Sequence, residues 1–440
     1  MHNKIFSFFQ IILLLLPISL ITGPAIPDIT ITFSGIFFLI FIHYKNIYKS
    51  IYKDNFFLIS IFFWIYLILI SFFAENKDLS FKESLIFIRL LLIPIFIIYW
   101  YSVDSKFLIK ILTLVFICEI FVSADTLFQF LNYETKSGFG KDIFGFESNW
   151  YGRLTGPFGD ELIPGAYLSR FAFIGLAYIF IELKKHKFNN IYTIIYLLFL
   201  GLAIFASGER MALATYLLGL GFLVIFFTQK RKIIFISLIL LISSIFITKQ
   251  IHPFYNDYKI IESTPYHLGL KVEKQFSCDI NSNEICKKIY NLQPSFYEVI
   301  KNFKISAYGE IYNLSLNIFK DHKLLGAGLN NFTYLCKNDD RYSVIINKYV
   351  CVSHPHNIYL QWLVEAGILG LFFFISYIFF LFYKILANNK NEYAILSITP
   401  ILVLFWPIMS TGSILKNWNG VSIFFIIGVC LILSKFKTKN

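Results

Sequence analysis

The stretch NIYLQWLVEAGILGLFFFISYIFFLFY, residues 357–383, holds 27 residues, of which only Glu365 is charged. An α-helix rises about 1.5 Å per residue, and crossing a hydrocarbon core of roughly 30 Å takes about 20 apolar residues. This stretch is therefore long enough to span a membrane. Similar runs recur along most of the 440-residue chain, which is 57% hydrophobic and 15% charged. The pattern predicts an all-α polytopic membrane protein.

The apolar runs predict about twelve transmembrane helices, with one long polar loop before the tenth. The expected spans are residues 5–21, 29–43, 56–73, 85–101, 107–131, 162–182, 191–207, 211–227, 232–248, 357–383, 393–409 and 419–434. The chain then divides into helices one to nine over 1–248, a loop domain over 249–356 and helices ten to twelve over 357–440. The first run could pass for a signal peptide, but no small-residue cleavage site follows it, so we interpret it as a transmembrane helix.

The net charge of +12 is explained by the positions of the basic residues. They cluster in alternate loops, at Lys45/Lys49/Lys53, Lys184/Lys185/Lys187, Lys230/Arg231/Lys232, Lys384/Lys390 and Lys435/Lys437/Lys439. The positive-inside rule then predicts that both termini are cytoplasmic and that the long loop lies outside. Because the membrane topology explains the positive net charge, we expect no nucleic-acid partner.

Four of the six cysteines fall in the long loop, namely Cys278, Cys286, Cys336 and Cys351. An oxidising compartment on the outer side would permit disulfides there. Proximity in sequence favours the pairs Cys278–Cys286 and Cys336–Cys351, although four cysteines allow three pairings. A zinc site is the alternative, but no C-x₂-C spacing supports it.

The same loop contains a segment with helical periodicity, which predicts a helix over residues 306–321. Its apolar side chains form one stripe, made of Ile311, Leu314, Ile318 and Phe319. Gly326 and Gly328 interrupt whatever follows. Such a helix would lie on the membrane surface or pack over the bundle, either capping a cavity or serving as a structural lid without substrate contact.

Ionisable groups in or beside transmembrane helices are costly, and each is a candidate for a functional site. Counted from the predicted topology, nearly all of them fall in the outer half of the membrane or at its surface: Arg89, Asp125, Arg153, Asp160, Glu161, Arg170, Glu209, Arg210, His354, His356 and Glu365. Any one alone could be a structural ion pair or a snorkelling side chain. Their convergence from several helices predicts an outward-facing polar cavity.

Arginine and histidine in such a cavity suit a phosphorylated lipid substrate. Guanidinium groups make bidentate hydrogen bonds to phosphate, and imidazole exchanges a proton near neutral pH. Glycans linked to undecaprenyl pyrophosphate combine a membrane-embedded tail with such a head. Pyrophosphate is already a good leaving group and no acidic metal-ligand motif stands out, so we expect neither metal nor cofactor. The pair His354 and His356 could bind zinc, but no third ligand is obvious.

Three motifs in the C-terminal half resemble the O-antigen ligase and O-antigen polymerase superfamily. They are ASGERMALATYLLGLGF (206–222), FKDHKLLGAGLNNF (319–332) and HPHNIYLQWLVEAGILGL (354–371). The resemblance implies a GT-C-like helical membrane fold with one large periplasmic loop. It also implies a place in the bacterial inner membrane, a role in lipopolysaccharide biosynthesis and an active site facing the periplasm.

The resemblance also suggests roles for individual residues. Arg210 matches the arginine that binds the lipid-linked pyrophosphate. His356, directly before Asn357, matches the essential histidine that activates the acceptor hydroxyl or holds the phosphates. Arg153 and His354 are further candidates for pyrophosphate binding. We expect His356 to face Arg210 across the outward-opening cavity.

The chain departs from the family pattern at one position. Many relatives have an arginine shortly before the helix of the loop, and Glu310 stands there in this sequence. A glutamate cannot bind a diphosphate directly. Either another cation fills this role, with Lys301, Lys304 and Lys323 nearby in sequence, or this branch differs in acceptor or chemistry.

The activity implied is that of a metal-independent, inverting glycosyltransferase. It would move a glycan from undecaprenyl pyrophosphate to a periplasmic acceptor such as lipid A–core. An O-antigen polymerase and a protein O-oligosaccharyltransferase are alternatives, because the same motifs do not specify the acceptor. A lipid or polysaccharide transporter is the alternative from another class, but transporters usually show internal repeats and midplane sites, and this chain shows neither.

Overall fold

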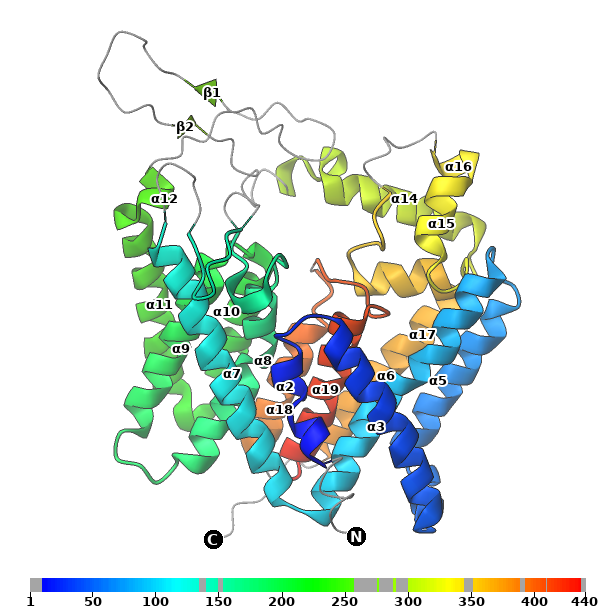
Figure 1. Ribbon diagram of the computed structural model, residues 1–440, viewed down its shortest axis with the longest axis horizontal. Coiled ribbons are helices and arrows are strands. Elements are labelled where there is room, and N and C mark those ends of the chain that lie inside the picture. Colours follow the sequence, from blue (N-terminus) through cyan, green and yellow to red (C-terminus); the bar gives the residue numbers. More distant parts are fainter. Residues whose placement is uncertain are drawn as a thin grey trace. The chain divides into compact units, whose positions relative to one another are not determined.

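The computed structural model describes residues 10–133, 140–148, 153–256, 275–276, 288–289, 300–343, 351–387, 392–408 and 410–436. Almost every element in them is a helix (Figure 1). The strands found there are the two-residue β1 (Gln275–Phe276) and β2 (Lys288–Ile289), which pair antiparallel. The prediction of an all-α protein is confirmed for the part of the chain that is described.

Seven helices in this part are long and apolar enough to cross a membrane. They are α3 (Ala25–Tyr44), α6 (Lys77–Val103), α7 (Lys106–Leu131), α8 (Pro164–Glu182), α9 (Asn189–Ala206), α11 (Arg231–Ile251) and α17 (Ile358–Leu386). Four shorter apolar helices are α5 (Asn55–Ser71), α10 (Arg210–Phe226), α18 (Glu392–Leu404) and α19 (Asn417–Leu433). Each coincides with one predicted span, so the polytopic membrane architecture is confirmed. Of the first predicted span, only the end from residue 10 is described, where α2 is Leu16–Ser19. The total of twelve stays a prediction.

The remaining helical elements are short or lie between the apolar helices. They are α4 (Tyr48–Tyr52), α12 (Pro253–Asn256), α14 (Ala307–Asp321), α15 (Asn331–Asn338), α16 (Asp340–Ser343) and the 3₁₀ turns η1 (Gly156–Phe158), η2 (Thr228–Lys230) and η3 (Phe303–Ile305). The predicted helix over 306–321 is confirmed as α14. Of its apolar stripe, Ile311, Leu314 and Ile318 are buried.

The helices form two compact units, residues 1–114 with 308–440 (unit 1) and residues 115–307 (unit 2). In unit 1, α6 packs against α19, α5 and α3. A Cβ at Gly428 of α19 would meet the Pro94 Cα of α6 at 3.0 Å, so the missing side chain allows the two backbones to approach. In unit 2, α8 packs against α9 and α10, and α11 packs against α9. The division into 1–248, 249–356 and 357–440 stays a prediction about topology.

The stretch 357–383 is helical as expected, but it is not one continuous helix. Gly367 has φ 69° and ψ −172°, which interrupts α17. Figure 1 shows α17 changing direction. At the break, the backbone N–H groups of Ala327 and Gly328 donate to the carbonyls of Val364 and Glu365 at 2.8 and 3.0 Å. Hydrogen bonds lost within the helix are thus replaced by bonds to another segment, as burial requires.

A disulfide joins Cys336 of α15 to Cys351, with the Cα atoms 5.6 Å apart. This is one of the two pairs expected from sequence proximity. The other pair, Cys278 and Cys286, lies outside the described residues. Cys118 and Cys430 are buried free thiols.

Candidate functional site

The histidine motif of unit 1 forms a turn that leads directly into α17. Asn357 is the N-cap residue, and its Oδ1 accepts hydrogen bonds from the backbone N–H groups of Tyr359 and Leu360 at 2.9 and 3.1 Å. Its Nδ2 donates to the Pro407 carbonyl at 2.8 Å. Asparagine is a favoured N-cap because its oxygen satisfies N–H groups that have no partner within the helix. Asn357 therefore fixes where the helix begins and ties the turn to the segment before α19.

Both ring nitrogens of His354 are occupied. Nε2 lies 3.0 Å from the Thr411 carbonyl, which can only accept, so Nε2 carries the proton. Nδ1 then accepts from the Ser353 hydroxyl at 2.9 Å. Burial, with the nearby His356 and Lys416, lowers the pKa of His354 to about 4. His354 is a neutral residue held in place by its neighbours.

His356 is placed differently, although its ring centroid lies only 4.3 Å from that of His354. Its backbone is in the left-handed region, with φ 54°, and its carbonyl accepts from the Thr411 N–H at 2.9 Å. Among the described residues, neither ring nitrogen of His356 has a hydrogen-bond partner. Burial lowers the pKa of His356 below its usual 6.5. A half-buried, neutral imidazole with an unoccupied acceptor nitrogen can take a proton from a bound hydroxyl.

The amphipathic helix α14 contributes two aromatic residues to the same turn. The Tyr308 ring meets the His356 ring edge-on, with centroids 6.0 Å apart. The Tyr312 hydroxyl shares a hydrogen bond with the Asn357 side chain. These contacts place α14 beside the histidine motif within unit 1, as expected for a helix that covers a site.

Lys416, which lies just before α19, was not among the site residues predicted from the sequence. Its segment is joined to α17 because Gln361 Nε2 donates to Ser413 Oγ at 2.7 Å and Gln361 Oε1 accepts from the Ile414 N–H at 3.3 Å. Lys416 is exposed, and its ammonium makes no hydrogen bond or ion pair with any described residue. Its charge acts on Glu83, on His354 and on the buried carboxyl group of Glu365. None of the three family motifs contains Lys416, so its place near the histidine turn could not be predicted from the sequence.

Two other candidate charges of unit 1 are held by structural partners. Arg89 forms an ion pair with Asp28 at 2.6 Å and donates to Asn417 Oδ1 at 2.9 Å, which links α3, α6 and α19. Glu365 is 1% exposed and accepts from Gln361 Nε2 at 3.3 Å. These contacts explain why Arg89 and Glu365 are charged residues within the helices, without a role in substrate binding.

In unit 2, the arginine segments gather around Glu209. Arg153 lies 3.6 Å from the Glu209 carboxylate and donates to the Leu162 carbonyl at 2.6 Å. Glu209 also accepts from the Gly165 N–H at 2.8 Å, at the start of α8. Burial raises the pKa of Glu209 to about 7, against the opposing effects of Arg153, two backbone N–H groups and Arg170. Glu209 therefore changes charge near neutral pH. When it is protonated, the net positive charge of the cluster rises.

Arg210 is the first residue of α10 and is exposed. Arg170 is buried within α8, and Asp160 and Glu161 are exposed. Asp125 is buried in α7 and accepts from the Ile143 N–H at 2.8 Å, so it anchors the loop that follows α7. Since Arg210 belongs to unit 2 and His356 to unit 1, the expectation that they face each other stays a prediction.

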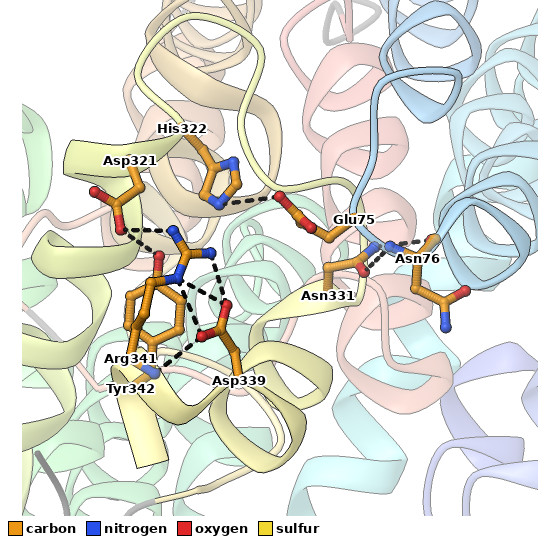
Figure 2. Close-up of polar contacts among 8 residues, drawn as sticks. All are labelled: Glu75, Asn76, Asp321, His322, Asn331, Asp339, Arg341 and Tyr342. Carbon is orange, nitrogen blue, oxygen red and sulfur yellow. Dashed lines mark hydrogen bonds and ion pairs between the residues drawn. The ribbon is translucent and has the colours of Figure 1, made fainter. Parts of the chain in front are cut away.

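The motif at 319–332 is a structural anchor within unit 1 (Figure 2). Asp321 accepts from the Tyr342 hydroxyl at 2.5 Å and lies 3.7 Å from Arg341. Asn331 Oδ1 accepts from the Asn76 N–H at 2.8 Å, and its Nδ2 donates to the Asn76 carbonyl at 3.2 Å. His322 lies 3.6 Å from Glu75. The loop between α14 and α15 is thereby attached to the turn between α5 and α6.

The comparison with family models matches residues 195–375 to the O-antigen ligase family. The matched segment covers less than half of the 440-residue chain. It runs from α9 to the middle of α17 and contains Arg210, α14 and the histidine turn. The comparison with curated proteins finds no match. Among the described residues, no three His, Cys, Asp or Glu side chains are grouped as metal ligands.

Proposed function

We propose that this protein transfers a preassembled glycan from undecaprenyl pyrophosphate to lipid A–core at the periplasmic face of the bacterial inner membrane. The observation that carries the proposal is the imidazole of His356, which is neutral and has no hydrogen-bond partner among the described residues, in the segment that matches the O-antigen ligase family. A GT-C-like architecture is part of the same proposal.

In the proposed reaction, the acceptor hydroxyl oxygen attacks the anomeric carbon of the glycan. The bond from that carbon to the pyrophosphate oxygen breaks, and undecaprenyl pyrophosphate leaves with the electron pair. His356 takes the proton of the acceptor hydroxyl. Attack opposite the leaving group inverts the anomeric carbon.

The departing pyrophosphate gains negative charge, which cations stabilise most strongly where water is excluded. We assign this role to Arg210, with Arg153 as a second contact and no metal ion required. His354 is a weaker candidate, because its ring nitrogens are engaged with Ser353 and Thr411.

The Cys336–Cys351 disulfide supports a periplasmic position for the loop, because disulfides persist in oxidising compartments. The alternating basic clusters support cytoplasmic termini.

The experiment is to delete the gene and complement it with wild type, Arg210→Ala or Arg210→Lys, then separate lipopolysaccharide on a gel. We expect Arg210→Ala to lose the ladder, a fall of about a hundredfold or more, with polymer retained on the lipid carrier. Arg210→Lys should restore little, because lysine lacks the bidentate fork. Arg231→Ala, at an exposed arginine that opens α11, is the matched control and should restore the full ladder.

A single-repeat band above core in the deletion strain would mean polymerase and not ligase. A full ladder with Arg210→Ala would remove this arginine from the site.

We assign to Lys416 the positive charge that Glu310 does not provide. A cation just before the start of α19 is unfavourable with the helix dipole, and only the charge of Glu83, without a direct ion pair, acts against this cost among the described residues. We expect Lys416→Ala to weaken donor binding about tenfold, seen as a raised KM in proteoliposomes, whereas Lys416→Arg should stay near wild type. Lys77→Ala, at another exposed lysine of unit 1, is the control. Equal KM values for Lys416→Ala and Lys77→Ala would contradict the assignment.

A further inference from the structure

The chain after α7 folds into a tight hairpin over residues 141–147. Lys141 and Glu147 form an antiparallel bridge and an ion pair at 3.4 Å at its base. Asp142 Oδ1 accepts from the Phe146 N–H at 2.7 Å, and Gly145 turns the chain with φ 87°. These local bonds define the hairpin without help from its apolar side chains.

The hairpin lies against the side of α7 and does not project from its end. The Ile143 N–H donates to the buried Asp125 at 2.8 Å, and Gln129 Nε2 reaches the Phe146 carbonyl at 3.5 Å. The Phe144 ring lies 6.4 Å from the ring of Phe121. Since α7 ends at Leu131 and rises about 1.5 Å per residue, these contacts lie roughly 3 to 15 Å below that end.

The tip of the hairpin is apolar and uncovered. Ile143, Phe144 and Phe146 are 53%, 61% and 58% exposed. They continue an exposed apolar stripe on α7 at helical spacing, made of Ile117, Phe121, Phe128 and Leu131. In a membrane-spanning helix, such a stripe faces lipid. The apolar tip and charged base match the polarity change across a membrane interface.

We propose that the hairpin 141–147 is immersed in the bilayer, with the side chains of Ile143, Phe144 and Phe146 in contact with lipid acyl chains. The sequence alone placed this segment in an outer loop. The hydrogen bonds to Asp125 and Gln129 instead hold it at the level of the last turns of α7, and they satisfy backbone groups that acyl chains cannot.

The test is spin labelling of Phe144→Cys in the full-length protein, reconstituted in phosphatidylethanolamine/phosphatidylglycerol vesicles in a Cys278→Ser/Cys286→Ser background. We expect the label to collide more often with oxygen, which enters lipid, than with a water-soluble nickel chelate. Phe62→Cys, 67% exposed on the apolar helix α5, is the lipid control, and Lys337→Cys, exposed on α15, is the aqueous control.

A label at 144 as accessible to nickel as that at 337 would overturn the proposal, since the tip would then be in water. Low accessibility to both reagents would also overturn it, because a protein partner would then cover the tip. If Phe144→Cys does not elute as a folded protein, Ile143→Cys and Phe146→Cys give the same test, because the hairpin is anchored at both positions through backbone atoms.

Discussion

Replacing His356 with asparagine is expected to lower the rate of glycan transfer by about 10²- to 10⁴-fold, the usual contribution of a general base. Asparagine is the informative substitution because the His356 backbone has φ 54°. Asparagine tolerates this left-handed conformation, whereas alanine would add strain. The variant therefore removes the imidazole and keeps the turn. The measurement is single-turnover transfer in proteoliposomes, with thermal unfolding as a check on folding.

The pH dependence of transfer tests the same assignment. Burial lowers the pKa of His356 below 6.5, so its base form is the major form at neutral pH. The wild-type rate should fall as the pH drops, with a midpoint below 6.5, as the ring is protonated. The residual rate of His356→Asn should lack this fall.

His354→Gln is the matched control for His356→Asn. Because the His354 ring bridges Ser353 and Thr411, its loss should lower thermal stability and reduce transfer much less than His356→Asn. Transfer by His356→Asn within a few-fold of wild type would exclude His356 as the base.

Substituting Gly367 with alanine is expected to be strongly damaging, although it adds only one methyl group. Its φ of 69° and ψ of −172° lie in a region that is essentially restricted to glycine, at a cost of about 1–3 kcal/mol for another residue. In addition, a Cβ there would overlap the Leu324 carbonyl. Both effects disrupt the contact between the break in α17 and the preceding loop. We expect a lowered Tm and reduced transfer, because the first segment of α17 carries Gln361 and follows the histidine turn.

Gly221→Ala in α10 is the control for this substitution, because nothing lies within 4 Å of a Cβ at that position. Alanine in a helix interior should be neutral or stabilising there, by about 0.5–1 kcal/mol. A wild-type Tm for Gly367→Ala, measured beside Gly221→Ala, would show that the break tolerates a side chain.

The apolar helices could be predicted from sequence because hydrophobic length and periodicity are local properties. The runs now seen as α7 and α8 were placed within two residues at each end. The start of α6 was missed by eight residues, since Asn76 caps it within a polar stretch. The stripe of α14 followed from residue spacing alone, and the Cys336–Cys351 pair from proximity.

The histidine motif separates what the local sequence pattern could predict from what depends on tertiary contacts. The sequence by itself determined that a membrane-spanning run follows the two histidines. The structure starts that helix at Ile358, with Asn357 as its N-cap and His356 in the turn before it. Only the tertiary structure decided that both ring nitrogens of His354 are hydrogen-bonded while those of His356 have no partner among the described residues, because the Thr411 carbonyl that holds His354 lies 57 residues away. The same holds for the break at Gly367 and for the place of Lys416. Each depends on hydrogen bonds between segments that are distant in the chain. Such bonds produce no periodic pattern in the sequence from which they could be predicted.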